Sequence, residues 1–223
     1  MGNRIQLRSQ DGFALGAYRA EPDGTPRGAV VVIQEIFGVN DHIREVADGY
    51  ARDGYVAIAP QIFDRVERDV ELGYQEADLG RGVEIAFQKL DHKLALQDVQ
   101  AAVDAAAAHG KVGVVGYCFG GLLTWRAACE LSGIDAAVAY YGGGIVREAD
   151  RQPRCPVVMH FGEKDAHIPM KDVDTIKAAQ RDVRIFVYPA DHGFNCDHRA
   201  SYDAESADLA RQRTLEFFAE HLG

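Results

Sequence analysis

Uninterrupted apolar runs recur along the chain and indicate buried strands. Residues 29–33 read Ala-Val-Val-Val-Ile, a pattern typical of a strand buried on both faces of a parallel sheet. Near the start, residues 5–7 and 13–18 flank the turn dipeptide Asp11-Gly12 and predict an antiparallel hairpin. Further strands are predicted at residues 55–59, 111–115, 136–141, 157–161 and 184–188.

Segments with helical spacing of apolar residues separate these strands. A helix capped by Asn40 or Asp41 is expected to end at Gly54. Further helices are predicted at residues 91–108, 122–131, 172–181 and 204–222.

The alternation of strands and helices predicts the fold class. It favours one α/β domain over residues 1–223, with a mostly parallel, doubly wound sheet, helices on both faces and the N-terminal antiparallel hairpin at one side. Ligands of such sheets bind beyond the carboxyl ends of the strands. Residues 61–90 are less regular and carry mixed charge, so they are either a solvated excursion or a cover over a site.

Composition limits the classes of partner. Hydrophobic residues make up 47% of the 223 positions and charged residues 26%, which is ordinary for a globular protein. The net charge of −10 argues against nucleic acid and anionic membranes as partners, because both require an excess of Lys and Arg. No secretory signal or membrane-spanning run is evident. We expect a cytoplasmic monomer or small homo-oligomer that acts on a small molecule.

The cysteines contain no CxxC pair. This spacing favours neither a disulfide framework nor a structural zinc site, and it fits free thiols in a reducing compartment. The four are Cys118, Cys129, Cys155 and Cys196.

Cys118 lies in the pattern expected of a nucleophile. The strand at 111–115 runs into Gly116-Tyr117-Cys118-Phe119-Gly120, and a helix follows. This G-x-C-x-G spacing is that of a nucleophile elbow with Cys in place of Ser, where glycines give room for a sharp turn. The following helix N-terminus favours negative charge on sulfur, and the N–H of Phe119 is expected to face an oxyanion. A buried structural thiol is the alternative.

A thiol nucleophile needs a base, and the later strand ends supply candidates. In this fold an acid and then a histidine follow the nucleophile. Asp165 comes just after the strand at 157–161, and His192 comes just after the strand at 184–188. We therefore expect Asp165 to orient His192, and His192 to activate the thiol.

Other residues at this edge compete for these roles. Glu163 is the rival carboxylate, and His167 and His198 are the rival histidines. The spacing of His192, Cys196 and His198 also fits three metal ligands, but no fourth is evident, so no metal is expected.

The loop after residues 29–33 supplies two further candidates. The backbone N–H of Ile36 is expected to complete the oxyanion hole with that of Phe119. Glu35 is a carboxylate at the sheet edge beside the expected thiol. Either it points to water, or it contacts the thiol or a substrate proton, and it could keep the thiol protonated until substrate arrives.

Taken together, these segments resemble the dienelactone hydrolase (carboxymethylenebutenolidase) family. The matching motifs are Gln34–Asn40, Gly116–Gly121, Gly162–Asp165 and Asp191–Phe194, which are spread over nearly the whole chain in the family's order. The resemblance implies a compact α/β-hydrolase fold, with no metal or organic cofactor. It also implies opening of the lactone ring of a chlorinated-aromatic breakdown product to give maleylacetate.

By the same resemblance, Cys118, His192 and Asp165 form a catalytic triad, and Glu35 assists it. Family members that act on dienelactone hold its carboxylate with two arginines. Arg81 is a loosely aligned match for one of them. The other lies four residues after the catalytic histidine, where this chain has Cys196, and the nearest arginine is Arg199.

Replacing a bidentate arginine by cysteine puts the dienelactone substrate in question more than the hydrolase chemistry. The substrate-binding candidates are Arg81, Arg199, Phe37 and Tyr117. The leading hypothesis is a cysteine hydrolase of a lactone or carboxylic ester that works through an acyl-enzyme. The alternatives are a thiol-based sensor or ligand trap with little turnover, and a purely structural protein.

Overall fold

A computed structural model describes residues 2–223, and its centre is one eight-stranded sheet. The strand order is β1-β2-β4-β3-β5-β6-β7-β8. β1 and β2 pair antiparallel, as do β2 and β4, and all other neighbours are parallel. The strands are β1 (Asn3–Arg8), β2 (Ala14–Ala20), β3 (Ala29–Ile33), β4 (Val56–Pro60), β5 (Val112–Tyr117), β6 (Ala136–Tyr140), β7 (Val157–Gly162) and β8 (Arg184–Tyr188).

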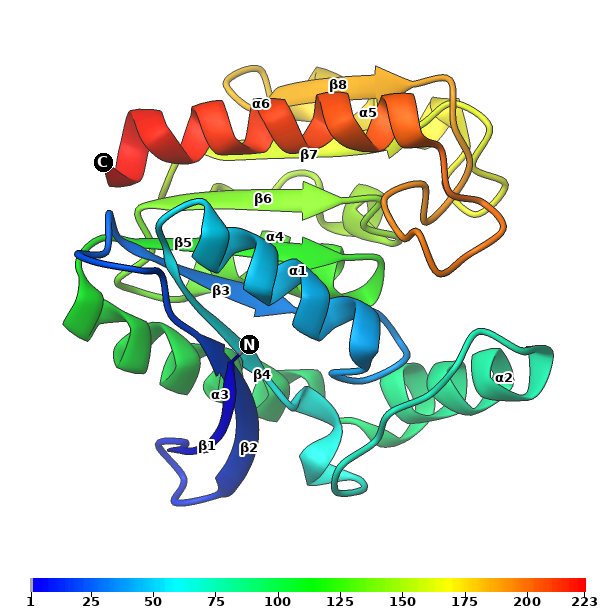
Figure 1. The fold of residues 1–223 in the computed structure, drawn as a ribbon. Coiled ribbons are helices and arrows are strands. Elements are labelled where there is room, and N and C mark those ends of the chain that lie inside the picture. Colours follow the sequence, from blue (N-terminus) through cyan, green and yellow to red (C-terminus); the bar gives the residue numbers. More distant parts are fainter. Residues whose placement is uncertain (1) are drawn as a thin grey trace.

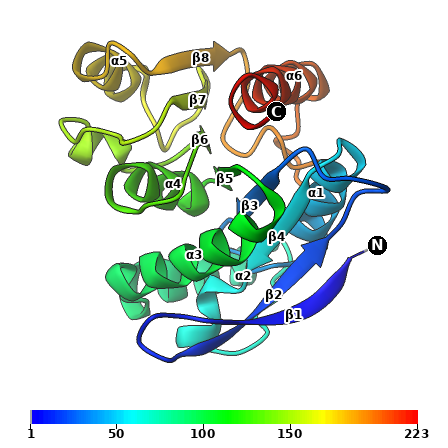
Figure 2. The same cartoon turned by 90° about the vertical axis from the view of Figure 1, so that its left-hand side faces the viewer.

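Helices cover both faces of this sheet. Figure 2 shows α3, α4 and α5 on one side, and α1 and α6 on the other. The helices are α1 (Asp41–Arg52), α2 (Glu76–Glu84), α3 (His92–Ala106), α4 (Phe119–Glu130), α5 (Met170–Ala179) and α6 (Ala204–Leu222). The predicted fold class, with its mostly parallel sheet and N-terminal hairpin, is confirmed.

The central strands are buried because both of their faces are covered. Every residue of β3, β4, β5, β6 and β7 is buried. This explains why the sequence shows continuous apolar runs there instead of an alternation of apolar and polar residues.

Side-chain caps fix the starts of three helices. The Asn40 side chain accepts a hydrogen bond from the N–H of Ile43, 3.3 Å away, at the start of α1. Asp91 caps α3 and Asp203 caps α6 in the same way. Each cap satisfies a backbone N–H that has no partner within its helix, which fixes where the helix begins.

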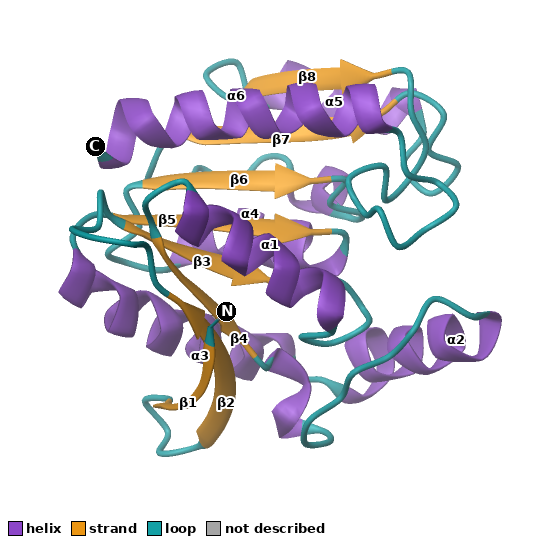
Figure 3. Ribbon diagram, in the orientation of Figure 1, coloured by secondary structure: helices purple, strands orange, loops and turns teal. Residues whose placement is uncertain are grey.

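The carboxyl ends of the parallel strands meet at one edge, and the loops that follow them gather there (Figures 1 and 3). Residues 61–90 form a short 3-10 helix, α2 and a π-helical turn at Ile85–Lys89. α2 lies beyond this edge of the sheet (Figure 1), so the irregular segment covers the place where a ligand would bind. Among the described residues, the helices are too short or too polar to cross a membrane.

Candidate active site

Cys118 occupies a strained turn between β5 and α4. Its backbone angles are φ 55° and ψ −115°, in a region that non-glycine residues rarely adopt. The flanking glycines allow this turn to fit. A Cβ on Gly116 would lie 2.1 Å from the carbonyl oxygen of Gly120, and a Cβ on Gly120 would lie 2.3 Å from that of Ile33. No larger residue fits at either position without a shift of the backbone.

The turn presents Cys118 to a cavity of about 550 Å³. Cys118 is the N-cap of α4, so its sulfur lies at the positive end of the helix dipole. Phe119 is the first residue of α4, and both Phe119 and Ile36 line the same cavity. The two residues expected to supply the oxyanion-hole N–H groups therefore lie beside the thiol.

His192 joins Cys118 to Asp165. Its Nε2 lies 3.1 Å from the Cys118 sulfur, and its Nδ1 lies 2.7 Å from Oδ2 of Asp165. The other carboxylate oxygen, Oδ1, accepts hydrogen bonds from the backbone N–H groups of His167 at 2.8 Å and Ile168 at 3.1 Å. Because both carboxylate oxygens of Asp165 are engaged, the carboxylate and the imidazole are held in one orientation.

The charges in this cluster shift two pKa values. Burial alone would lower the pKa of His192, but the Cys118 sulfur and the hydrogen bond to Asp165 outweigh it and raise the pKa to about 10. Burial raises the pKa of Asp165, yet His192 and the two backbone N–H donors more than offset it, so its pKa is lowered. The first shift favours the imidazolium form of His192, and the second favours the carboxylate form of Asp165.

Glu35 is buried next to this cluster and pairs with Arg199. Its side chain is 1% exposed, and Oε1 lies 3.5 Å from Nη1 of Arg199. Its second oxygen, Oε2, is buried without a hydrogen-bond partner among the described residues. Arg199 also lies over the ring of Phe37 in a cation–π contact, with the guanidinium carbon 5.7 Å from the ring centroid. Arg199 and Phe37 both line the cavity.

The rival residues do not occupy the acid and base positions. Glu163 is exposed and makes no hydrogen bond to His192 in the described chain. The ring of His167 packs edge-on against that of His192, with centroids 5.3 Å apart. His198 points elsewhere, with its Nε2 2.8 Å from Oε2 of Glu45.

The structure corrects two predicted substrate contacts. Arg81 lies outside the cavity, where its half-exposed guanidinium pairs with Glu67. The reason is helical phase: Leu79 and Val83 of the same helix face the cavity, and Arg81 lies between them on another face.

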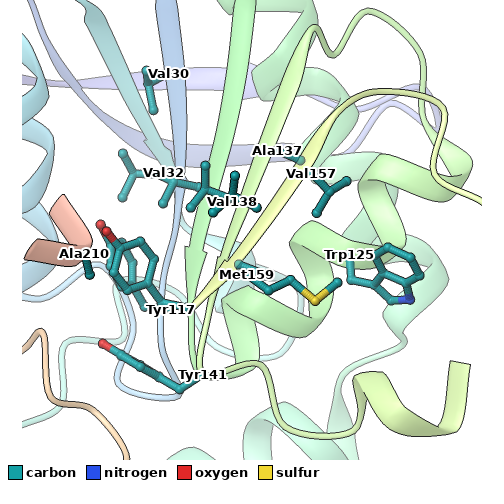
Figure 4. Packing of buried hydrophobic residues seen from close by; sticks show 14 of the residues in the cluster. Val30, Val32, Tyr117, Trp125, Ala137, Val138, Tyr141, Val157, Met159 and Ala210 are labelled. Carbon is teal, nitrogen blue, oxygen red and sulfur yellow. The ribbon is translucent and has the colours of Figure 1, made fainter. Parts of the chain in front are cut away.

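Tyr117 is also misassigned as a substrate contact. It is 2% exposed, and its hydroxyl lies 3.3 Å from that of Tyr50. Figure 4 shows it among core side chains near Ala210 of α6. As the last residue of β5, it projects into the core on that face of the sheet, whereas Cys118 belongs to the turn that follows.

Several cavity residues were not predicted from the sequence. Arg126 of α4 and Arg147 line the cavity, and Arg126 pairs with Glu148, with its Nε 2.9 Å from Oε1. Arg147 has no acidic partner in the described part of the chain. A weak signal was present for the apolar wall, because α2 and the turn after it place Leu79, Val83 and Phe87 at helical spacing in an otherwise polar segment.

The chain resembles known proteins along nearly its whole length. Residues 15–222 match the model of the "Dienelactone hydrolase family". A Synechocystis sp. protein with the provisional name of a carboxymethylenebutenolidase is 37% identical over 229 residues, which cover 93% of this chain and 92% of that protein. The carboxymethylenebutenolidase of Pseudomonas putida is 32% identical over 225 residues, which cover 96% of this chain and 95% of that enzyme.

A solved structure shows the same likeness in three dimensions. The crystal structure of a Klebsiella pneumoniae protein, provisionally named a dienelactone hydrolase, superposes with a TM-score of 0.88 at 34% identity, and the match covers 99% of both chains. The similarity therefore includes the loops that carry Cys118, Asp165 and His192.

Proposed function

Since this chain belongs to the dienelactone hydrolase family, and is therefore a hydrolase of lactones or esters with the α/β-hydrolase fold, we propose that Cys118 is its nucleophile. Cys118, His192 and Asp165 would then act as a triad. The observation that carries this proposal is the continuous contact from the Cys118 sulfur to Nε2 of His192 at 3.1 Å, and from Nδ1 to Asp165 at 2.7 Å.

In the first step, the Cys118 sulfur attacks the carbonyl carbon of the bound lactone or ester. His192 holds the thiol proton, and the N–H groups of Ile36 and Phe119 stabilise the negative charge that develops on the carbonyl oxygen. The C–O bond then breaks, His192 protonates the departing oxygen, and a thioester on Cys118 remains. For a lactone the departing hydroxyl stays attached to the acyl chain, so this step opens the ring.

In the second step, water releases the acyl group. His192, now neutral, removes a proton from water, which attacks the thioester carbonyl. The C–S bond of the resulting tetrahedral intermediate then breaks, which frees a carboxylic acid and restores the Cys118 sulfur beside protonated His192. Asp165 stabilises the imidazolium that forms in both steps and keeps Nδ1–H in place.

Glu35 and Arg199 form the charged border of the reaction centre. Glu35 is buried beside Arg199, so its negative charge stabilises the guanidinium at the cavity wall. Arg199 can in turn interact with a substrate carboxylate, in place of the arginine that this chain lacks at position 196. Arg147 adds an exposed positive charge at the same cavity. We propose a substrate with a small apolar body and a carboxylate.

We propose that the chain works as a single domain in a reducing compartment. One sheet runs from β1 to β8, and the family match extends over residues 15–222. All four cysteines are free thiols, which is expected for the cytoplasm.

The proposal is tested by steady-state hydrolysis of cis- and trans-dienelactone beside neutral short-chain aryl esters. Cys118→Ala should abolish turnover, whereas Cys155→Ala, which removes another half-buried thiol, should not. Unchanged turnover in Cys118→Ala would contradict the assignment. One burst of product without further turnover in the wild type would instead indicate a ligand trap.

The same assay tests the substrate contact. Arg199→Gln should raise KM for the anionic dienelactones about tenfold or more relative to KM for the neutral esters, because a hydrogen bond to a charged group is lost. Arg81→Gln should leave KM for the dienelactones and KM for the neutral esters within about twofold of wild type, since Arg81 pairs with Glu67 away from the cavity. An equal effect of Arg199→Gln on anionic and neutral substrates would refute the carboxylate contact.

A further inference from the structure

Four potential metal ligands converge outside the reaction centre. His42 and Glu45 come from the first turns of α1, and Asp197 and His198 come from the loop that follows β8 (Figure 1). Each offers one ligand atom, and all four atoms lie within 4.8 Å of one another. We propose that these side chains bind a divalent cation of the zinc class, which joins α1 to the loop.

The distances between these atoms fit a tetrahedral ion. Ligands about 2.0–2.1 Å from Zn²⁺ lie roughly 3.3–3.4 Å from each other in a tetrahedron. Nδ1 of His42 lies 3.3 Å from Oδ1 of Asp197, and Nε2 of His198 lies 2.8 Å from Oε2 of Glu45 and 3.8 Å from Oδ1 of Asp197. These three separations bracket the required value, and the other separations within the cluster are no longer than 4.8 Å.

The donor set suits such an ion. Two imidazoles and two carboxylates are ligands that Zn²⁺ takes in proteins, and the two carboxylates would balance its charge. His42, Glu45 and Asp197 also line a second cavity of about 340 Å³, which gives an ion a path from solvent.

His42 supplies an independent observation. Its side chain is only 3% exposed, and its Nε2 is buried without a hydrogen-bond partner among the described residues. Oε2 of Glu35 is likewise buried and has no hydrogen-bond partner among the described residues. Glu35, His42 and Cys196 offer ligand atoms within 4.8 Å of one another, so the His42 imidazole lies close to the Glu35 carboxylate.

An ion on Nδ1 of His42 would account for this unpartnered pair. A histidine that binds a metal through one nitrogen carries its proton on the other, and that N–H is commonly directed to a carboxylate. With the ion bound, His42 would direct Nε2–H at Glu35. The ordinary alternative is that the four side chains form only the two ion pairs His42–Asp197 and His198–Glu45.

Because of where the loop lies, a bound ion would also affect the candidate active site. Asp197 and His198 lie between His192 and Arg199, the base and the cavity cation of the proposed reaction. Binding both loop residues to α1 would hold that stretch of chain in place. Binding itself does not depend on the proposed hydrolysis.

The test is a titration of chelator-treated protein with Zn²⁺, read by calorimetry, and with Co²⁺, read by its visible absorption. The parent protein carries Cys118→Ala, so that the ion cannot bind the Cys118–His192 pair. We expect one ion per chain and the absorption of tetrahedral Co²⁺ without a thiolate charge-transfer band. The double change Glu45→Gln with Asp197→Asn should weaken binding more than tenfold.

Asp208→Asn is the matched control, because Asp208 lines the same cavity but is not one of the four ligands. This variant should bind Zn²⁺ with the affinity of the parent protein. Glu35→Gln should weaken Zn²⁺ about tenfold, as loss of an outer carboxylate commonly does. The circular dichroism and melting temperature of each metal-free variant establish that it is folded.

Three results would overturn the proposal. They are the absence of one-to-one binding in the parent, equal affinity in the Glu45→Gln, Asp197→Asn protein, and a thiolate charge-transfer band that places Co²⁺ on Cys196. An unchanged affinity in Glu35→Gln would refute the link between the ion and Glu35. None of these readouts uses turnover, so they stand apart from the test of the nucleophile.

Discussion

The orientation of one imidazole depends on a carboxylate that has no freedom to turn. Asp165 is 3% exposed, and its two oxygens are divided between His192 and two backbone N–H groups. A carboxylate held in this way keeps Nδ1–H of the histidine directed at Asp165 and Nε2 directed at the sulfur. Glu163, two residues earlier, is exposed and lacks these contacts.

This difference predicts unequal effects for two neighbouring carboxylates. Asp165→Asn should lower kcat by about 10²–10⁴-fold, because an amide favours the wrong tautomer of His192 and does not stabilise an imidazolium. Glu163→Gln should leave kcat within about twofold. Steady-state kinetics of both variants on one aryl ester make the comparison, and a loss of similar size in both would show that Asp165 has no special role.

The sequence predicted the three residues that the structure brings into contact, but not the cavity around them. Cys118, Asp165 and His192 each follow a strand, and strand ends are visible as the limits of apolar runs. The direction of a side chain on a surface helix such as α2 is not visible in that way. Arg81 was therefore misassigned, whereas Arg147 was missed because its position depends on how the 3-10 helix Ile145–Glu148 packs.

At the scale of elements, the turn from β5 to α4 is held by close backbone contacts on both sides. α4 packs so closely on the sheet that a Cβ on Gly120 would collide with the backbone of Ile33 and Gln34, at the end of β3. The backbone atoms in contact cannot rotate away as a side chain would. The strained conformation of Cys118 persists because these contacts hold the turn on both sides.

Two glycine substitutions should distinguish the effect of close packing on stability from the effect of helix propensity. Gly120→Ala should destabilise the protein by more than about 2 kcal/mol, because its Cβ would lie 2.3 Å from the Ile33 carbonyl oxygen. Gly80 lies on the exposed helix α2, where an added Cβ meets open space. Gly80→Ala should therefore raise the free energy of unfolding by about 0.5–1 kcal/mol. Urea unfolding measures both, and equal stabilities would contradict this account of the turn.

The elements themselves were largely predictable, apart from the segment at 61–90. Long apolar runs gave the strands, and side-chain caps gave helix starts such as that of α1 at Asn40. Within 61–90, charged and apolar residues are interleaved without one clear period. Its path depends on tertiary contacts such as the pairing of Gly38 with Glu71, which no local pattern encodes.

At the scale of the whole molecule, a buried polar network ties α6 to β7 and β8. His160 of β7 is fully buried, with Nδ1 2.8 Å from the Tyr188 hydroxyl and Nε2 3.1 Å from the Thr214 hydroxyl. Burial, together with the charge of Arg213, lowers its pKa to about 3. His160 is therefore neutral in the folded protein at any moderate pH.

The network predicts a loss of stability in mild acid. Between pH 6.5 and 3 the unfolded chain protonates His160 and the folded protein does not, so the unfolded state binds more protons and stability falls as pH falls. Wild type should lose up to about 1.4 kcal/mol per pH unit more than His160→Gln. His109→Gln is the control, because His109 is not fully buried. Parallel curves for wild type and His160→Gln would contradict the neutral buried state.

The sheet also explains why distant residues form one centre. The parallel strands β5, β7 and β8 end at the same edge, so the loops after them bring together side chains 74 positions apart, as in the Cys118–His192 contact. The family match over residues 15–222 includes all three of these loops, so they belong to the part of the chain that is shared with the family.

The most direct test of that chemistry is to observe the acyl group on the protein. Wild type is mixed with a slowly hydrolysed aryl ester, quenched at intervals, and examined by intact-mass spectrometry and peptide mapping. The account predicts one acyl group per chain on Cys118, which decays at the rate of steady-state turnover and is absent in Cys118→Ala. Turnover without an adduct on Cys118, or an adduct there that never hydrolyses, would contradict it.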